Sequence, residues 1–122
     1  MAKPIINEVK ALNTFAQDTK IFGDIDSDGD IRMDGVLEGK LNCKGRVVIG
    51  PEARIKGTIN ASNAEILGYV EGEISVTDLL SLKGTAVIKG DLIMGKFSVE
   101  PGASFTGNCT MNGNGKSLPV LE

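Results

Sequence analysis

One short pattern recurs six times along this chain: an apolar residue, any residue, glycine, any residue and a second apolar residue. Successive copies begin 16, 18, 15, 18 and 17 residues apart, a spacing that chance does not readily produce. A repeat of this length is typical of a fold in which each unit stacks only on its neighbours. The six copies are IFGDI (21–25), LEGKL (37–41), IKGTI (55–59), VEGEI (70–74), IKGDL (88–92) and FTGNC (105–109).

Apolar residues alternate around each repeat glycine, as Ile55, Ile59 and Ala61 do around Gly57. A period of two is that of a β-strand rather than of a helix. The glycine itself falls on an inward position. A chain that bends around a narrow core has no space for a side chain there, and glycine also tolerates unusual φ values. We therefore expect a bend at each repeat glycine.

Two further small or apolar positions complete a coil of three short strands, one after every copy but the first and one after every copy but the last. A variable turn then leads to the next copy; it is short in 33–37 and 66–70, and two residues longer in 49–55, 82–88 and 99–105. The sequence thus predicts an all-β, single-domain β-solenoid of about six windings of ~17 residues over residues 20–111, with flexible tails at 1–19 and 112–122. The two further positions are held by Cys43, Ala61, Val76, Met94 and Met111, and by Met33, Ile49, Ile66, Leu82 and Val99.

Outward residues support the proposed register of the windings. The residues just before the six glycines are Phe22, Glu38, Lys56, Glu71, Lys89 and Thr106. In stacked coils they would lie above one another about 4.8 Å apart. The middle four alternate in sign, and opposite charges in such a column attract by ~0.2–1 kcal/mol per pair.

Composition narrows the classes of function. The chain contains no histidine, the commonest general acid/base and metal ligand. Basic residues are scattered and the net charge is −3, so no nucleic-acid footprint is visible. Without a secretory signal or a long apolar run, we expect a cytoplasmic protein with reduced thiols. Cys43 and Cys109 both fall in apolar columns, which predicts small buried hydrophobes.

Two short motifs suggest ligand sites, but neither is complete. Asp24, Asp26 and Asp28 start like a calcium loop, yet position 12 is Gly35 where a bidentate Glu is needed, and the flanks alternate as strands. The stretch 113–117 resembles a phosphate loop whose first glycine is replaced by Thr110. Hexapeptide-repeat acyltransferases are similar in coil size but generally use a histidine base. We predict no catalytic, cofactor-binding or metal site.

The repeat segments together resemble the bactofilins, a family of bacterial polymer-forming cytoskeletal proteins. The resemblance implies a right-handed, roughly triangular parallel β-helix flanked by flexible tails. It also implies end-to-end polymers that need no nucleotide, often on the cytoplasmic face of the inner membrane. It favours alternating like-to-like contacts, which the residues themselves leave open. The segments are 23–41, 44–59, 70–74, 79–92 and 96–109.

The N-terminal segment has two interpretations. Ile5, Ile6, Val9 and Leu12 share a helical face, and this face could contact a membrane, as the hydrophobic N-terminal tails of some bactofilins do. Glu8 interrupts the apolar run, so a disordered tail or a segment that covers the first coil is the alternative.

The end windings of a solenoid have one neighbour only, and their outer faces are expected to be apolar. We predict that copies join end to end into a filament, a scaffold that positions cell-shape or cell-wall proteins. The rival interpretation is a monomeric or small-oligomer binding module, and Leu118, Val120 and Leu121 could instead fold back over the last winding. The residues expected at the polymerisation interface are Ile21, Ile25, Val99, Phe105, Cys109 and Met111.

Overall fold

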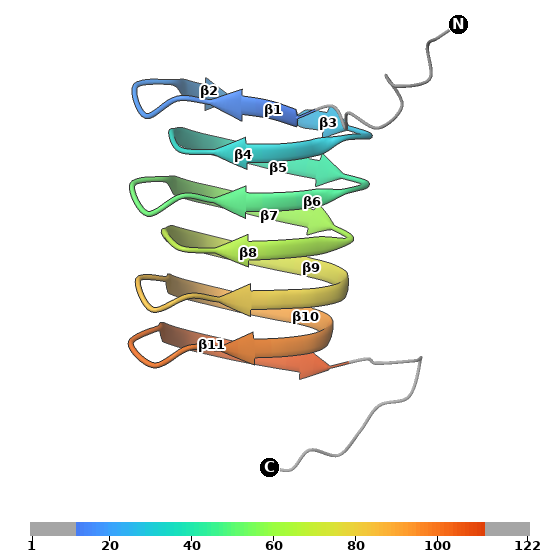
Figure 1. The fold of residues 1–122 in the computed structure, drawn as a ribbon, viewed down its shortest axis with the longest axis vertical. Coiled ribbons are helices and arrows are strands. Elements are labelled where there is room, and N and C mark those ends of the chain that lie inside the picture. Colours follow the sequence, from blue (N-terminus) through green and yellow to red (C-terminus); the bar gives the residue numbers. More distant parts are fainter. Residues whose placement is uncertain (1–11, 112–122) are drawn as a thin grey trace, which may run out of the picture.

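A computed structural model describes residues 12–111, which form strands and no helix (Figure 1). The strands join in parallel into one wound sheet. Within residues 12–111, no helix is long and apolar enough to cross a membrane. The strands are β1 (Leu12–Phe15), β2 (Lys20–Phe22), β3 (Ile25–Ser27), β4 (Asp30–Met33), β5 (Val36–Cys43), β6 (Arg46–Ile49), β7 (Arg54–Ala61), β8 (Asn63–Ile66), β9 (Tyr69–Leu82), β10 (Val87–Val99) and β11 (Ser104–Met111).

Each winding has three sides, so the predicted all-β solenoid of about six coils is confirmed. The first side precedes the repeat glycine and includes β2, and the second side follows it and includes β3. Strands β5, β7 and β11 run through the glycine and cover both sides. The third side holds β1, β4, β6 and β8, and β9 and β10 continue onto it around the next corner (Figure 1).

The repeat glycines stack in one column, and their backbone explains why no other residue occurs there. Their φ angles lie between 133° and 148°, a region that L side chains rarely adopt. A β-carbon on Gly57 would overlap the carbonyl oxygen of Gly39, and the same overlap recurs at Gly72, Gly90 and Gly107 with the preceding glycine. Gly23 in the first winding differs, because a β-carbon there would meet no atom within 4 Å.

The register follows the predicted columns. Glu38 pairs with Lys56, Lys56 with Glu71, and Glu71 with Lys89, so the alternating charge column is confirmed. The core residues are Ala, Val, Ile, Leu and Met together with Cys43, and no polar or charged residue of the described part is buried. Such a core is aliphatic, as the low aromatic content of 4% requires.

The solenoid begins earlier than the sequence indicated. Strand β1 lies inside the range 1–19 that we assigned to the N-terminal tail, and it pairs in parallel with β4. Phe15 stacks on Met33 at the head of the column that continues to Ile49, Ile66 and Leu82. The solenoid therefore includes residues from Leu12 onward, earlier than residue 20, and the sequence did not indicate this because the half-winding contains a third-side strand but no glycine pattern.

Two matched substitutions test the close approach of the windings. Gly57→Ala should abolish folding or lower the free energy of unfolding by more than ~4 kcal/mol, because it adds a backbone overlap to an unfavourable φ. Gly23 has nearly the same φ as Gly57, but a β-carbon there would meet open space. Gly23→Ala should therefore lower the free energy of unfolding by only ~1–3 kcal/mol. Urea unfolding followed by circular dichroism measures both, and equal losses of stability would contradict the proposed role of the overlap.

Candidate assembly faces at the two ends of the solenoid

The last winding leaves an apolar face without a strand stacked on it among residues 12–111. Among the described strands, β11 pairs only with β10. Its inward residues Phe105 and Met111 are half-buried, whereas their counterparts Ile88 and Met94 in the preceding winding are each 1% exposed. The difference arises because β11 covers the inward residues of β10, whereas no strand within residues 12–111 covers those of β11. This C-terminal face consists of Phe97, Val99, Ala103, Phe105, Cys109 and Met111.

The first winding is open in the same way. Phe15, Ile21 and Ile25 are only partly buried, and we call them the N-terminal face. Leu37 and Leu41, which stack on Ile21 and Ile25, are fully buried. The open space beside Gly23 belongs to this end as well.

The predicted interface residues thus fall into two groups at opposite ends of the rod (Figure 1). Val99 is 51% exposed, although it points inward in the same column as the fully buried Leu82. One candidate escaped the sequence prediction: Phe22 is 70% exposed on the outside of the first winding. The available signal was an aromatic residue at the head of a column in which the next four residues are charged.

The two cysteines have different environments. Cys43 is buried, as predicted, and its thiol donates to the carbonyl oxygen of Gly29 at 2.9 Å. Burial raises the pKa of the Cys43 thiol. Cys109 stacks on Leu92 as predicted, yet it is exposed, because it lies on the uncovered side of the last winding. Partial burial still raises the pKa of Cys109, so neither thiol is activated as a nucleophile.

The aspartates of the first winding bind neighbouring groups of the second winding. Asp24 Oδ1 accepts a hydrogen bond from the Lys40 backbone N–H at 3.3 Å. Asp28 Oδ1 lies 3.7 Å from Lys44 Nζ. Across the part of the chain that the structure describes, no group of three or more His, Cys, Asp or Glu side chains could hold a metal ion. Asp26 Oδ1 accepts a hydrogen bond from the Asn42 side-chain amide at 2.9 Å, so the three carboxylates connect the first two windings instead of converging on one point.

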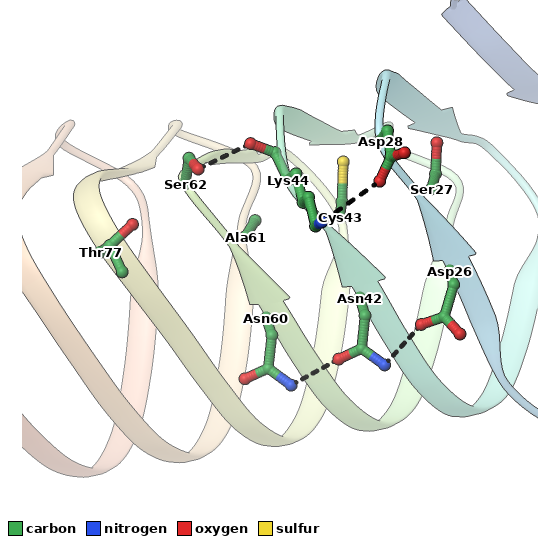
Figure 2. A pocket seen from close by; sticks show the side chains of 10 residues that line it. All are labelled: Asp26, Ser27, Asp28, Asn42, Cys43, Lys44, Asn60, Ala61, Ser62 and Thr77. Atoms are coloured by element: carbon green, nitrogen blue, oxygen red, sulfur yellow. Dashed lines mark hydrogen bonds and ion pairs between the residues drawn. The ribbon is translucent and has the colours of Figure 1, made fainter.

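A shallow groove of about 520 Å³ runs along the corner between the second and third sides (Figure 2). Its polar side chains form a ladder along the solenoid axis: Asn60 donates to Asn42 at 2.8 Å, and Asn42 donates to Asp26 at 2.9 Å. The hydroxyl groups of Ser27 and Ser62 donate to backbone carbonyl oxygens at 3.2 and 2.7 Å. The ladder therefore connects three successive windings through side-chain hydrogen bonds.

Comparison with known proteins gives consistent matches. Residues 13–110 match a family model described as "Bactofilin: Polymer-forming cytoskeletal". Bactofilin BacO of Myxococcus xanthus is 32% identical over 92 residues, which cover 75% of this chain and 73% of the relative. Bactofilin BacP of the same organism is 29% identical over 91 residues, 75% of this chain and 38% of that protein.

Two solved structures are also similar. The bactofilin of Thermus thermophilus, determined by cryo-EM as double helical filaments, matches with a TM-score of 0.78 and 30% identity, covering 81% of this chain and 98% of that one. The cytoskeletal bactofilin BacA, determined by solid-state NMR, matches with a TM-score of 0.71 and 29% identity, covering 81% and 92%.

The exposure of the two thiols predicts their reactivity. At high dilution, a chromogenic disulfide reagent should modify Cys109 quickly and Cys43 only after unfolding, because Cys43 is buried. The Cys109→Ser variant serves as the control and should lose the fast phase alone. Two fast phases in the folded protein, or a fast phase that survives in Cys109→Ser, would contradict the assignment of Cys109 to an uncovered face.

Proposed function

Because this chain belongs to the bactofilin family, we propose that it is a cytoskeletal scaffold whose copies join end to end into filaments without a nucleotide. Membership of a polymer-forming cytoskeletal family agrees with the expectation of a structural protein rather than an enzyme. In the proposed role, filaments in the cytoplasm position proteins of cell shape or cell-wall synthesis. The outward charged column of Glu38, Lys56, Glu71 and Lys89 repeats along each filament and offers these clients a regular surface.

The observation that carries this proposal is the apolar C-terminal face. Burying one side chain of the size of Phe105 contributes ~1.5–3 kcal/mol, and several inward residues are covered together when a second copy stacks there. The edge of β11 also presents backbone N–H and C=O groups that can pair with another strand. Contacts at both ends of a straight rod do not close into a ring, so assembly continues as a filament.

Two finer features belong to the same proposal. Successive copies alternate in direction, with like ends in contact, as the family resemblance favours. Filaments of this chain also pair side by side, by analogy with the double helical filaments of the Thermus thermophilus protein. Both features concern contacts between copies, and neither affects the fold of a single copy.

A charge on the C-terminal face should block assembly. Phe105→Arg is expected to abolish filaments and leave folded, β-rich monomers or dimers, because an unpaired buried charge costs several kcal/mol at each joint. Thr106→Arg is the matched control: this neighbour is exposed on the outer side, so filaments should persist. Negative-stain electron microscopy at micromolar protein distinguishes these outcomes.

The same images separate the filament from its rival, the small binding module. Intact filaments of Phe105→Arg would refute the role of that residue. Discrete particles of the unmodified chain at every concentration would favour the rival, including the case in which Leu118, Val120 and Leu121 cover the last winding. Those three residues lie outside the described part of the chain.

Membrane attachment through the N-terminal segment is the remaining part of the proposal. Ile5, Ile6 and Val9 lie outside the described residues, while Leu12 belongs to β1. A deletion that tests this segment must therefore end at residue 11, because a longer one removes a strand of the solenoid.

Liposome co-sedimentation tests the attachment. The full chain should pellet with the vesicles, and the chain without residues 1–11 should stay in the supernatant, because the proposed apolar contact has been removed. A full-length control with Ile5→Asp and Val9→Asp should behave like the deletion. Equal pelleting of all three proteins would end this part of the proposal.

A further inference from the structure

The outer surface of the first side is formed by two columns of residues that run along the whole solenoid. Neighbouring windings pair here residue by residue, and the register shift between β9 and β10 lies elsewhere, between Met94 and Lys96. We call the two columns the glycine-side column and the corner-side column. The first consists of Phe22, Glu38, Lys56, Glu71, Lys89 and Thr106, and the second of Lys20, Val36, Arg54, Tyr69, Val87 and Ser104.

The charges of the glycine-side column are complementary to those of the same column in the opposite direction. A two-fold axis along the strands, placed midway between the third and fourth windings, sets the windings of a second copy opposite the first in reverse order. Glu38 then faces Lys89 of the second copy, and Lys56 faces Glu71. Each contact occurs twice, because the two copies exchange roles. All four side chains are exposed, and none forms an ion pair within residues 12–111, so each is available to a second molecule.

The corner-side column is compatible with the same two-fold axis. Val36 faces Val87 of the second copy, and both are half-buried apolar residues. Arg54 faces Tyr69, and an arginine is attracted to the face of an aromatic ring. Within one copy the Arg54 guanidinium already lies 5.6 Å from the centre of the Tyr69 ring. The axis therefore brings two arginines and two tyrosines together at the centre of the contact.

The direction of the second copy and the choice of side follow from the same comparison. A two-fold axis parallel to the rod would exchange the two columns and set Arg54 opposite Lys56, two like charges.

The other two sides of the solenoid are not complementary to themselves in this way. The antiparallel operation gives the second side one pair of opposite charges, Lys40 with Asp91. Within the described residues it gives the third side none, because Arg46 faces Asn63 there and the remaining charges face uncharged residues. The first side is therefore the one whose charges favour a second copy of this chain.

The turns at the edge of the first side alternate between the two copies over the middle of the contact. Turn 50–53 of one copy lies level with the two-residue corner 67–68 of the other, above which a hollow of about 280 Å³ opens (Figure 1). Turn 83–86 lies level with the two-residue corner 34–35 in the same way. At the outermost windings two longer turns, 16–19 and 100–103, lie level with each other. The close contact therefore spans the middle four windings, which carry all four charges of the glycine-side column.

We propose that the first side is the surface through which two filaments pair, with antiparallel copies related by this two-fold axis, and the proposal rests on the filament function above. The first winding of each copy lies level with the last winding of the other, so the joints of the two filaments coincide and no winding of a neighbouring copy enters the contact. A joint whose own two-fold axis is normal to the first side keeps the next copy facing the second filament. Pairing covers the charged column, so a client that binds this column competes with the second filament.

Charge reversal and rescue at the centre of the contact test this surface. In electron micrographs, Lys56→Glu and Glu71→Lys should each reduce the fraction of paired filaments about tenfold, because a modest contact is repeated at every copy. Single filaments should remain. The double variant K56E/E71K sets opposite charges across the axis again and should restore pairing.

The double variant also separates contact between copies from stacking within one copy. Each single variant and the double variant place two like-charged pairs next to each other in the glycine-side column of one copy. Restored pairing therefore cannot result from better stacking within the solenoid. Lys40→Glu is the matched control: it makes the same charge change on the exposed second side and should pair like the unmodified chain.

The outcomes separate this inference from the filament proposal. If the unmodified chain forms only single filaments, or if Lys56→Glu filaments stay paired, the first side is not the lateral surface, although the filament function stands. The alternating charges would then serve stacking within one rod alone. Failure of the double variant to restore pairing would contradict the contact between Lys56 and Glu71. Equal loss of pairing in Lys40→Glu, or loss of all filaments in Lys56→Glu, would overturn the assignment of lateral contact to the first side.

Discussion

The structure depends on one close contact: the approach of each repeat glycine to the carbonyl oxygen of the glycine one winding earlier. At this point the space that a β-carbon would fill is occupied by backbone. The contact allows the chain to bend between the first and second sides while the strands of successive windings stay paired. The bend in turn keeps the rod narrow, and a narrow rod accommodates an aliphatic core with few aromatic residues.

A rod built in this way buries its apolar side chains along its length but leaves those at its two ends partly exposed. Every inner winding buries its apolar residues against two neighbours, whereas the described part of the chain leaves Ile21 and Ile25 at one end and Phe105 and Met111 at the other half-covered. Each inner winding is covered by the windings next to it. At the ends of the rod, a winding of a second copy can provide the same cover. Fold and proposed assembly thus rest on the same physical interaction, the stacking of one winding on the next.

Most of the fold could be predicted from the sequence, because the glycine pattern and the columns of stacked residues depend only on the spacing of residues along the chain. The pairing of Glu38 with Lys56 and the position of Cys43 followed directly from it. Strand β1 could not be predicted in this way, because no glycine pattern precedes it. The available signal was the separation of Phe15 and Met33 along the sequence, which equals one repeat length. The exposure of Cys109 and the outward projection of the longer turns depend on which neighbours are present, and spacing alone does not contain that information.

Fibre diffraction from oriented filaments tests the central claim, that windings stack along the direction in which copies assemble. Strands that lie across the filament give a reflection near 4.8 Å on the meridian, parallel to the filament axis. The account predicts this meridional reflection from the unmodified chain. A 4.8 Å reflection on the equator would place the rods across the filament, and would contradict assembly through the end faces.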